Sequence, residues 1–166
     1  MRTVIIGNSG SGKTWLSRRL GNRFGVPVVH LDEIFWLPGG FDAKRDPSEV
    51  AEIVRRERAA VRWIAEGVYG DLASEFLSAA QTLIWLDLPW PVCKLRLGAR
   101  GFESKSHMNH AHTENGLKAL IEWAEGYSSR QGPSGRASHV SLFEQFAGER
   151  HKFELEDQVR AFLTAA

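Results

Sequence analysis

Near its amino terminus the chain reads Val4-Ile5-Ile6-Gly7-Asn8-Ser9-Gly10-Ser11-Gly12-Lys13-Thr14, and the last eight of these residues fit G-x-x-x-x-G-K-[ST]. The β-branched run 4–6 predicts a buried strand. The repeat Leu16, Leu20, Phe24 predicts a helix that ends at Gly25. A strand before and a helix after are the context that this pattern requires. The sequence therefore predicts a phosphate-binding loop over residues 7–14.

The chemistry of this loop follows from its residue types. Glycines allow backbone N–H groups to turn inward around an anion, and the N-terminus of the following helix favours phosphate. Lys13 is expected to reach the β- and γ-phosphates of a nucleotide, and the Thr14 hydroxyl is expected to bind Mg²⁺.

Strand and helix patterns alternate along the rest of the chain. Strands are predicted over 26–31, 63–65, 83–86 and 151–155, and helices over 46–62, 71–80, 92–100, 114–127, 140–147 and 156–166. The remaining loops are 35–45, the polar stretch 101–113 and the Gly/Ser/Pro stretch 128–138. This alternation predicts an α/β protein, a parallel sheet with helices on both faces.

Size and charge narrow the class of protein. The 166 residues suit a single domain, and the net charge of +1 does not favour nucleic-acid binding. The basic run Arg55, Arg56, Arg58, Arg62 is interpreted as a solvated helix face, with a nucleic-acid contact as the alternative. The only cysteine, Cys93, is expected to be a small core residue. We expect a cytoplasmic protein, because no internal disulfide can form and no apolar stretch is long enough to span a membrane.

Three acids follow predicted strands, at the sheet edge where open parallel sheets bind ligands. Asp32 could orient or deprotonate an acceptor hydroxyl, or bind Mg²⁺ through water, and Glu66 could hold the Mg²⁺ shell. For Asp87, capping of the following turn explains the residue equally well. The same structural alternative applies to Asp32 and Glu66.

Four arginines lie beside or within the flexible stretches. Arg96 and Arg100 share one helix face that leads into 101–113, and Arg130 and Arg136 both lie in the Gly/Ser/Pro stretch 128–138. Phosphoryl transfer depends on neutralising phosphate oxygens, so one arginine from each pair is a candidate to close over the phosphates.

The loop after the second strand is the predicted acceptor pocket. Trp36 could stack on a ring or simply pack, and Arg45 could grip an anionic acceptor. Three other tryptophans, Trp63, Trp85 and Trp123, occupy core-like positions. The trio His107, His110, His112 fits no structural zinc spacing and is interpreted as part of a polar loop, with a metal site as the alternative.

Several stretches resemble the P-loop kinases related to adenylate kinase, and most of all a bacterial group called topology modulation proteins. The matching residues are 7–14, Leu31-Asp32-Glu33-Ile34-Phe35-Trp36 with Pro38-Gly39, Arg45, 63–69 and 83–89. The resemblance covers residues 1–100 well and weakens beyond. The group usually carries Asp-Gly where this chain has Glu66-Gly67, and Pro-Gly-Trp where it has Pro38-Gly39-Gly40-Phe41.

This resemblance implies a three-layer fold with a five-stranded parallel sheet in the order 2-3-1-4-5. It also implies ATP with Mg²⁺, and an acceptor site on the segment after strand two, facing Asp32. The arginine pair Arg96 and Arg100 resembles the pair that enters the lid of adenylate kinase.

Together these observations predict one domain over 1–166, with an acceptor segment at about 33–62 and lid-like segments at about 101–113 and 128–138. The predicted activity is ATP-dependent phosphoryl transfer to a small acceptor, either a nucleoside monophosphate or another small metabolite. The alternative is a nucleotide-dependent switch with slow hydrolysis and a macromolecular partner. The predicted catalytic residues are Lys13, Asp32, Arg96, Arg100 and Arg130. The predicted substrate-binding residues are Asp32, Trp36, Arg45 and Glu66. The predicted metal ligands are Thr14 and Glu66.

Overall fold

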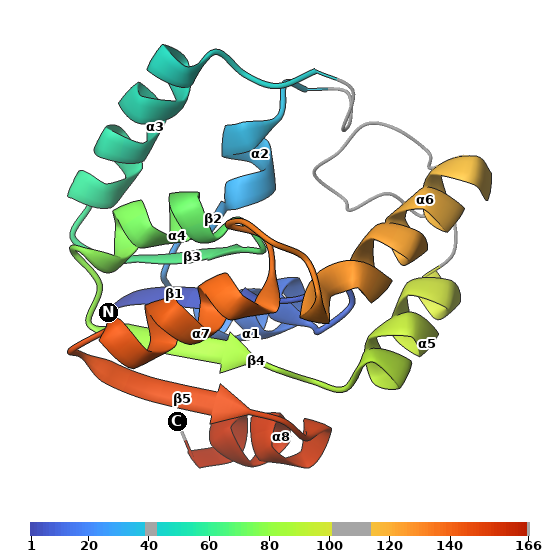
Figure 1. The fold of residues 1–166 in the computed structure, drawn as a ribbon. Coiled ribbons are helices and arrows are strands. Elements are labelled where there is room, and N and C mark those ends of the chain that lie inside the picture. The colour runs from blue at the N-terminus through green and yellow to red at the C-terminus, as the bar shows by residue number, and fades with distance from the viewer. Residues whose placement is uncertain (39–42, 101–113, 166) are drawn as a thin grey trace.

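The computed structural model describes residues 1–38, 43–100 and 114–165. Its single sheet has five strands: β1 (Arg2–Gly7), β2 (Val28–His30), β3 (Trp63–Gly67), β4 (Thr82–Leu86) and β5 (Glu149–Phe153). All neighbouring strands are parallel, in the order β2-β3-β1-β4-β5 (Figure 1). The predicted sheet and its strand order are confirmed, and the order places β1 with its following loop at the centre.

The helices follow the strands in the predicted alternation. They are α1 (Lys13–Phe24), α2 (Leu31–Phe35), α3 (Pro47–Ala59), α4 (Gly70–Leu77), α5 (Trp90–Arg100), α6 (Glu114–Glu125), the 3-10 helix η1 (Gly126–Ser128), α7 (Arg136–Gln145) and α8 (Glu156–Ala165). Local chemistry fixes several ends. Asp46 precedes Pro47, the first residue of α3, and its carboxylate accepts a hydrogen bond from the backbone N–H of Ser48. Helix α1 ends at Gly25, whose backbone lies in the left-handed region.

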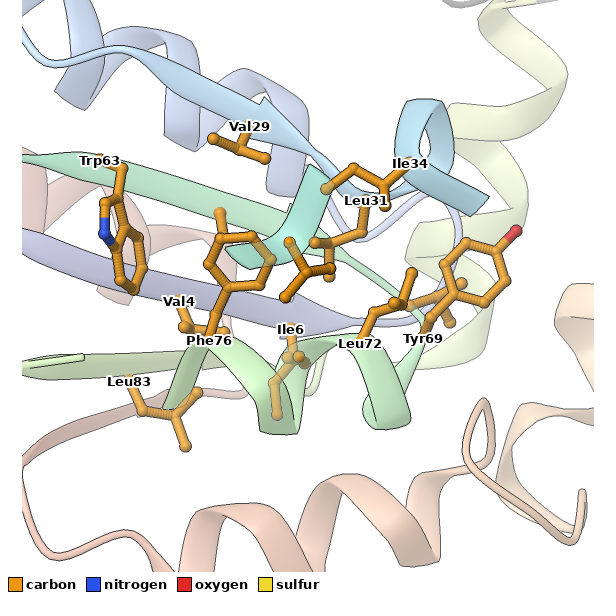
Figure 2. Close-up of a cluster of buried hydrophobic side chains, with 14 of the residues drawn as sticks. Val4, Ile6, Val29, Leu31, Ile34, Trp63, Tyr69, Leu72, Phe76 and Leu83 are labelled. Atoms are coloured by element: carbon orange, nitrogen blue, oxygen red, sulfur yellow. The ribbon is translucent and has the colours of Figure 1, made fainter. Parts of the chain in front are cut away.

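One face of the sheet packs against α4 and α7. Alternate residues of the central strands, Val4 and Ile6 of β1 and Leu83 and Trp85 of β4, point to this side. Figure 2 shows Phe76 of α4 beside Trp63, and Leu72 of the same helix closer to Tyr69. The rings of Trp63 and Phe76 meet edge to face at 5.2 Å, and truncation of such a buried ring to alanine costs about 3–5 kcal/mol.

The opposite face packs against α1 and α8. The intervening strand residues, Ile5, Ile64 and Ile84, contact Leu16 and Leu20 of α1 together with Val159 of α8. Helices therefore cover both faces, and the strands are apolar on both sides, as expected for a parallel sheet. Cys93 is fully buried, which confirms its prediction as a core residue.

Two local predictions were wrong. The predicted strand 26–31 is shorter in the structure, because β2 ends at His30. Residues 31–35, which join that predicted strand to the predicted loop 35–45, form helix α2, with Asp32 and Glu33 in its first turn. Acidic side chains in the first turn of a helix stabilise it, because they interact with the positive end of the helix dipole. This stabilisation of α2 outweighs the apolar run that predicted a longer strand. Trp123 was predicted to lie in the core but is 37% exposed, whereas Trp63 and Trp85 are buried.

Other predictions concern the connecting segments. The Gly/Ser/Pro stretch 128–138 overlaps η1 and the start of α7, so part of it is regular structure. The predicted lid 101–113, with His107, His110 and His112, lies outside the described residues. Within the described ranges, no helix is long and apolar enough to cross a membrane. In the basic run on α3, Arg55 makes an exposed ion pair with Glu52 on the same helix, and Arg58 pairs with Glu75 of α4.

Candidate active site

The loop at 7–14 runs from the end of β1 into the first turn of α1. Gly10 and Gly12 have φ angles of 80° and 96°, in the left-handed region that favours glycine. A Cβ at Gly10 would also collide with the backbone carbonyl oxygen of Cys93. The Ser11 side-chain oxygen is buried and has no hydrogen-bond partner among the described residues. The loop thus has the left-handed, closely packed glycine backbone in which N–H groups can turn inward around a phosphate.

Lys13 lies at the first position of α1 and is buried, with 7% of its surface exposed. Its Nζ donates a 2.9 Å hydrogen bond to the carbonyl of Asn8, inside the loop. Burial lowers the pKa of Lys13, while the nearby negative charge of Glu66 acts in the opposite direction. This ammonium is therefore held inside the concavity of the loop, where phosphate oxygens would bind.

Glu66 is the penultimate residue of β3, lies beside the loop and is almost fully buried. Its Oε1 accepts hydrogen bonds from the Thr14 hydroxyl at 2.8 Å and from His30 Nδ1 at 2.7 Å. Burial alone would raise the pKa of Glu66, but the His30 hydrogen bond, the Lys13 charge and the Thr14 hydrogen bond together hold that pKa below its usual value. The carboxylate is therefore ionised at neutral pH.

His30 had no predicted role, yet it orients this carboxylate. It ends β2 and is the register partner of Glu66 on β3, so the two side chains lie next to each other on one face. Because an ionised carboxylate can only accept, Nδ1 carries the ring proton. The order of β2 and β3 in the sheet, together with a histidine and an acid at matching strand ends, was the signal that could have revealed the pair.

The same residues fit a magnesium ion. Oε2 of Glu66 is buried without a hydrogen-bond partner in the part of the chain that the structure describes. Mg²⁺ prefers oxygen ligands and is usually held by one or two protein groups together with phosphates and water. The Thr14 hydroxyl, whose proton is directed at Oε1, leaves its lone pairs for such an ion. Thr14 and Glu66 are therefore the residues that would hold it, directly or through water.

A cavity of about 1210 Å³ opens along the carboxyl edge of the sheet. The loop residues 9–14 line its floor, α2 and the start of α4 line one side, and α5, α6 and α8 line the other. Ligand pockets commonly have volumes of about 300–1000 Å³. This space is therefore large enough for a nucleotide and a second small molecule together.

The side formed by α2 and α4 carries an acid and three aromatic rings. Asp32 is 4% exposed and lines the cavity. The rings of Phe35 and Tyr69 stack at 4.6 Å, and Trp36 meets Phe35 edge to face at 4.9 Å. Trp36 Nε1 donates a 2.7 Å hydrogen bond to the Tyr69 hydroxyl. Of the predicted substrate residues, the structure thus brings Asp32 and Trp36 together on one wall.

Arg45, the predicted anion-binding residue, lies just behind this wall. Its guanidinium donates to the backbone carbonyls of Glu33, Ile34 and Trp36, and it pairs with Glu49 at 3.6 Å. It is not among the described residues that line the cavity. These contacts hold α2 and the chain after it in place, so the local structure already uses this cation.

The two arginines of α5 both line the cavity. Arg96 donates a 2.9 Å hydrogen bond to the carbonyl of Ser11 and pairs with Glu156 at 2.9 Å. Arg100 lies near enough to Lys13 for its charge to lower the Lys13 pKa, and its own pKa is lowered by burial. Its Nε has no hydrogen-bond partner among the described residues. Arg96 is tied to the loop backbone, whereas part of the Arg100 guanidinium remains available to a ligand.

The other arginine pair is engaged elsewhere. The guanidinium of Arg130 stacks at 3.7 Å on the ring of Trp123 and donates to the carbonyl of Ser134. Arg136 forms a bidentate pair with Asp87 at 3.0 and 2.6 Å, and Lys152 joins at 3.2 Å. Neither arginine is among the described cavity-lining residues. The contacts shown for Asp87 join β4 to α7 and β5.

A buried polar chain behind the cavity was not predicted. The indole N–H of Trp85 donates to the Tyr127 hydroxyl at 3.2 Å, and that hydroxyl lies 2.6 Å from Nδ1 of His139. Nε2 of His139 lies 3.0 Å from the carbonyl of Val68, so Nε2 carries the ring proton and Nδ1 accepts. Burial lowers the pKa of His139 to about 4. This chain fixes α7 and η1 against the strand ends that position the site.

A hydrogen bond joins the phosphate-binding loop to α6. Asn8 Nδ2 donates a 2.9 Å hydrogen bond to the carbonyl of Ala124, across 116 positions of the chain. No local sequence pattern indicates such a contact. It brings the helix that carries Trp123 to the phosphate-binding loop.

Comparison with known proteins supports the fold. The crystal structure of a gluconokinase from Sinorhizobium meliloti 1021 superimposes with a TM-score of 0.55 at 12% sequence identity, covering 98% of this chain and 86% of that chain. No protein-family model and no curated protein matches the sequence. Membership of the topology modulation group stays a prediction. The chain has the α/β fold of the P-loop kinases, with the 2-3-1-4-5 sheet.

Proposed function

We propose that the protein is an ATP-dependent phosphotransferase that moves the γ-phosphate of ATP to a small acceptor. The observation that carries this proposal is the single cavity that joins the phosphate-binding loop to the buried carboxylate of Asp32. A protein that only bound or hydrolysed a nucleotide would need no second compartment with an acid and an aromatic wall. A kinase needs a nucleotide site and an acceptor site side by side, shielded from water.

The donor side supplies positive charge and backbone N–H groups. The N-terminus of α1 and the buried ammonium of Lys13 would bind the β- and γ-phosphates. Arg100 would neutralise charge that develops on the γ-phosphate oxygens during transfer. Bound at Thr14 and Glu66, Mg²⁺ would supply charge neutralisation and orientation of the triphosphate.

Asp32 supplies the acceptor side. Its carboxylate would orient an acceptor hydroxyl and take its proton as the acceptor oxygen forms a bond to the γ-phosphorus. At the same time the bond from the γ-phosphorus to the bridging oxygen of ADP breaks. Trp36 and Tyr69 would hold the acceptor through ring contacts on the same wall. The role of Arg45 as an anion-binding residue remains a proposal, and so does the lid role of Arg96 and Arg130.

Two classes of acceptor enter the first test. The structurally similar protein is a gluconokinase, so gluconate is one candidate acceptor for this chain. Nucleoside monophosphates are the other, from the resemblance to adenylate kinase relatives. The cytoplasm stays our expectation for the location.

The test is ADP release from Mg·ATP by the purified protein, alone and with a panel of nucleoside monophosphates, nucleosides, sugars and sugar acids. A rate increase with an acceptor, together with phosphate on that acceptor by ³¹P NMR, is the expected result. Slow release that no acceptor changes would contradict a kinase and favour the nucleotide switch. An Asp32→Asn variant that keeps the full rate with an acceptor would contradict the role of Asp32.

A further inference from the structure

The hydroxyl group of Tyr69 is a buried donor whose proton has no acceptor among the described residues. Tyr69 lies between β3 and α4, lines the cavity and is 8% exposed. Its oxygen accepts the hydrogen bond from Trp36 Nε1, a group that can only donate, so this contact leaves the phenolic proton unused. A buried donor without a partner costs free energy. Such a donor at a cavity wall is therefore a candidate to bind a ligand.

The hydroxyl is placed and protonated as a donor. Figure 2 shows the Tyr69 ring at one end of the buried cluster, with its oxygen directed away from the other labelled side chains. The ring stacks on Phe35, and both residues line the cavity. Burial raises the pKa of the hydroxyl, and the negative charge of Asp71 acts in the same direction. At neutral pH the group therefore keeps the proton that it would donate.

The backbone on both sides of Tyr69 is fixed by long-range hydrogen bonds. His139 Nε2 donates to the carbonyl of Val68 at 3.0 Å, and the N–H of Gly70 donates to the carbonyl of Pro133 at 2.9 Å. These contacts hold the residue in position before any ligand binds, which reduces the entropy that binding costs. The donor is thus part of a preorganised wall.

The second tyrosine of the chain shows that burial alone does not leave a hydroxyl proton unpaired. Tyr127 is 5% exposed, and its oxygen also accepts a hydrogen bond from an indole N–H, that of Trp85. Its proton, however, is donated to Nδ1 of His139 at 2.6 Å. Tyr127 is also absent from the described lining of the cavity. The unpaired proton therefore belongs to the tyrosine at the cavity wall.

From these contacts we infer that the Tyr69 hydroxyl donates a hydrogen bond to a second oxygen of the acceptor, separate from the oxygen that takes the phosphate. The acceptor is then a polyhydroxylated compound, either a nucleoside derivative or a sugar derivative, and not an alcohol with a single oxygen. A site that hydrogen-bonds one oxygen of its substrate discriminates against the analogue that lacks it. The inference rests on the proposed phosphotransferase function, and in it Tyr69 binds and orients the acceptor without transferring its proton.

The first test is the variant Tyr69→Phe, which keeps the ring and removes the hydroxyl. Transfer from Mg·ATP to adenosine, AMP and gluconate is measured for the wild type and the variant. For an acceptor that the wild type phosphorylates, we expect kcat/KM to fall by about three- to tenfold, the effect of one neutral hydrogen bond. The KM for Mg·ATP should not change, because the nucleotide phosphates bind at the loop 7–14.

The second test removes the partner oxygen from the acceptor. Adenosine and AMP are compared with their 2′-deoxy and 3′-deoxy forms, and gluconate with the forms that lack one hydroxyl at carbons 2 to 5. One such removal should lower kcat/KM of the wild type by about three- to tenfold and have no further effect in Tyr69→Phe. The nucleoside and sugar arms show which source of the shared chemistry the site accepts.

Tyr127→Phe is the matched control, because it also removes one buried hydroxyl that an indole N–H contacts. Any loss of activity in this variant is structural and should be the same factor for every analogue. An unchanged kcat/KM in Tyr69→Phe, or a loss with each deoxy analogue as large in Tyr69→Phe as in the wild type, would overturn the inference while leaving a kinase in place. No transfer to any compound of the acceptor panel, by protein that binds Mg·ATP, would contradict the proposed function and the inference with it.

Discussion

The Thr14 hydroxyl donates a 2.8 Å hydrogen bond to Oε1 of Glu66, across 52 positions of the chain. This contact joins the helix after β1 to the end of β3, the neighbouring strand in the sheet. The second oxygen of the same carboxylate is buried without a hydrogen-bond partner in the described structure. One carboxylate thus orients the hydroxyl through one oxygen and keeps the other for a ligand.

Replacing Glu66 by Gln should leave the fold intact and impair magnesium use. The amide oxygen can still accept from Thr14 and His30, but the negative charge is lost. We predict that the Mg²⁺ concentration needed for half-maximal activity rises by about 10- to 100-fold, the usual effect of losing a group that supports a bound metal. The measurement is a Mg²⁺ titration of ATP-dependent turnover, with thermal melting as the check on folding. An unchanged Mg²⁺ requirement would show that Glu66 does not serve the metal.

Arg100 and Arg130 should separate in their effects on turnover. Arg100 lines the cavity and has an unpartnered Nε among the described residues, whereas Arg130 is stacked on Trp123. We predict that Arg100→Gln lowers kcat by about 10³-fold, as expected for an arginine that stabilises the transferring phosphoryl group. The matched variant Arg130→Gln should show a much smaller loss of kcat. Equal kcat losses in the two variants would mean that the 128–138 segment supplies a catalytic arginine as well.

Stability should fall on mild acidification because of His139. Its folded pKa, about 4, lies below the ordinary value of 6.5, so the unfolded chain binds more protons between these two pH values. Stability contributed by the neutral ring is complete above pH 6.5 and is lost as pH falls from 6.5 towards 4, by about 3 kcal/mol in total. Denaturant unfolding at a series of pH values measures this loss.

Two variants show whether His139 is the cause. His139→Gln removes the titrating group and should flatten the pH dependence, even though the variant starts from a lower stability. His151, a partly exposed histidine on β5, provides the control, and His151→Gln should keep the wild-type slope. A slope that survives in His139→Gln would assign the acid sensitivity to another group.

The sequence predicted the parts of the site that depend on local pattern. Short-range sequence patterns were enough to predict the loop 7–14 with its flanking strand and helix. The rule that ligands bind beyond the strand ends was enough to select Asp32 and Glu66. The sheet order came from the resemblance. Within the described residues, the loop and its flanking strand and helix lie where the prediction placed them, whereas Asp32 lies in the first turn of α2 and Glu66 lies inside β3.

The remaining features depend on contacts between distant residues. The bidentate pair of Arg136 with Asp87 spans 49 positions, and the Asn8 contact with Ala124 spans 116. Arg45 could not be assigned from sequence, because its use depends on how helix α2 turns its carbonyls towards it. Trp123 was predicted to be buried because it occupies a core-like position in the sequence, but it lies at the cavity wall under Arg130.

Transfer of labelled phosphate from [γ-³²P]ATP tests the central claim most directly. Wild-type protein and Lys13→Ala are incubated with Mg²⁺, labelled ATP and the acceptor panel, and the products are separated. The account predicts label on a small acceptor with wild type, and a loss of at least about 10²-fold with Lys13→Ala, whose melting curve should still be cooperative. Label found only as inorganic phosphate, or equal transfer by Lys13→Ala, would contradict it.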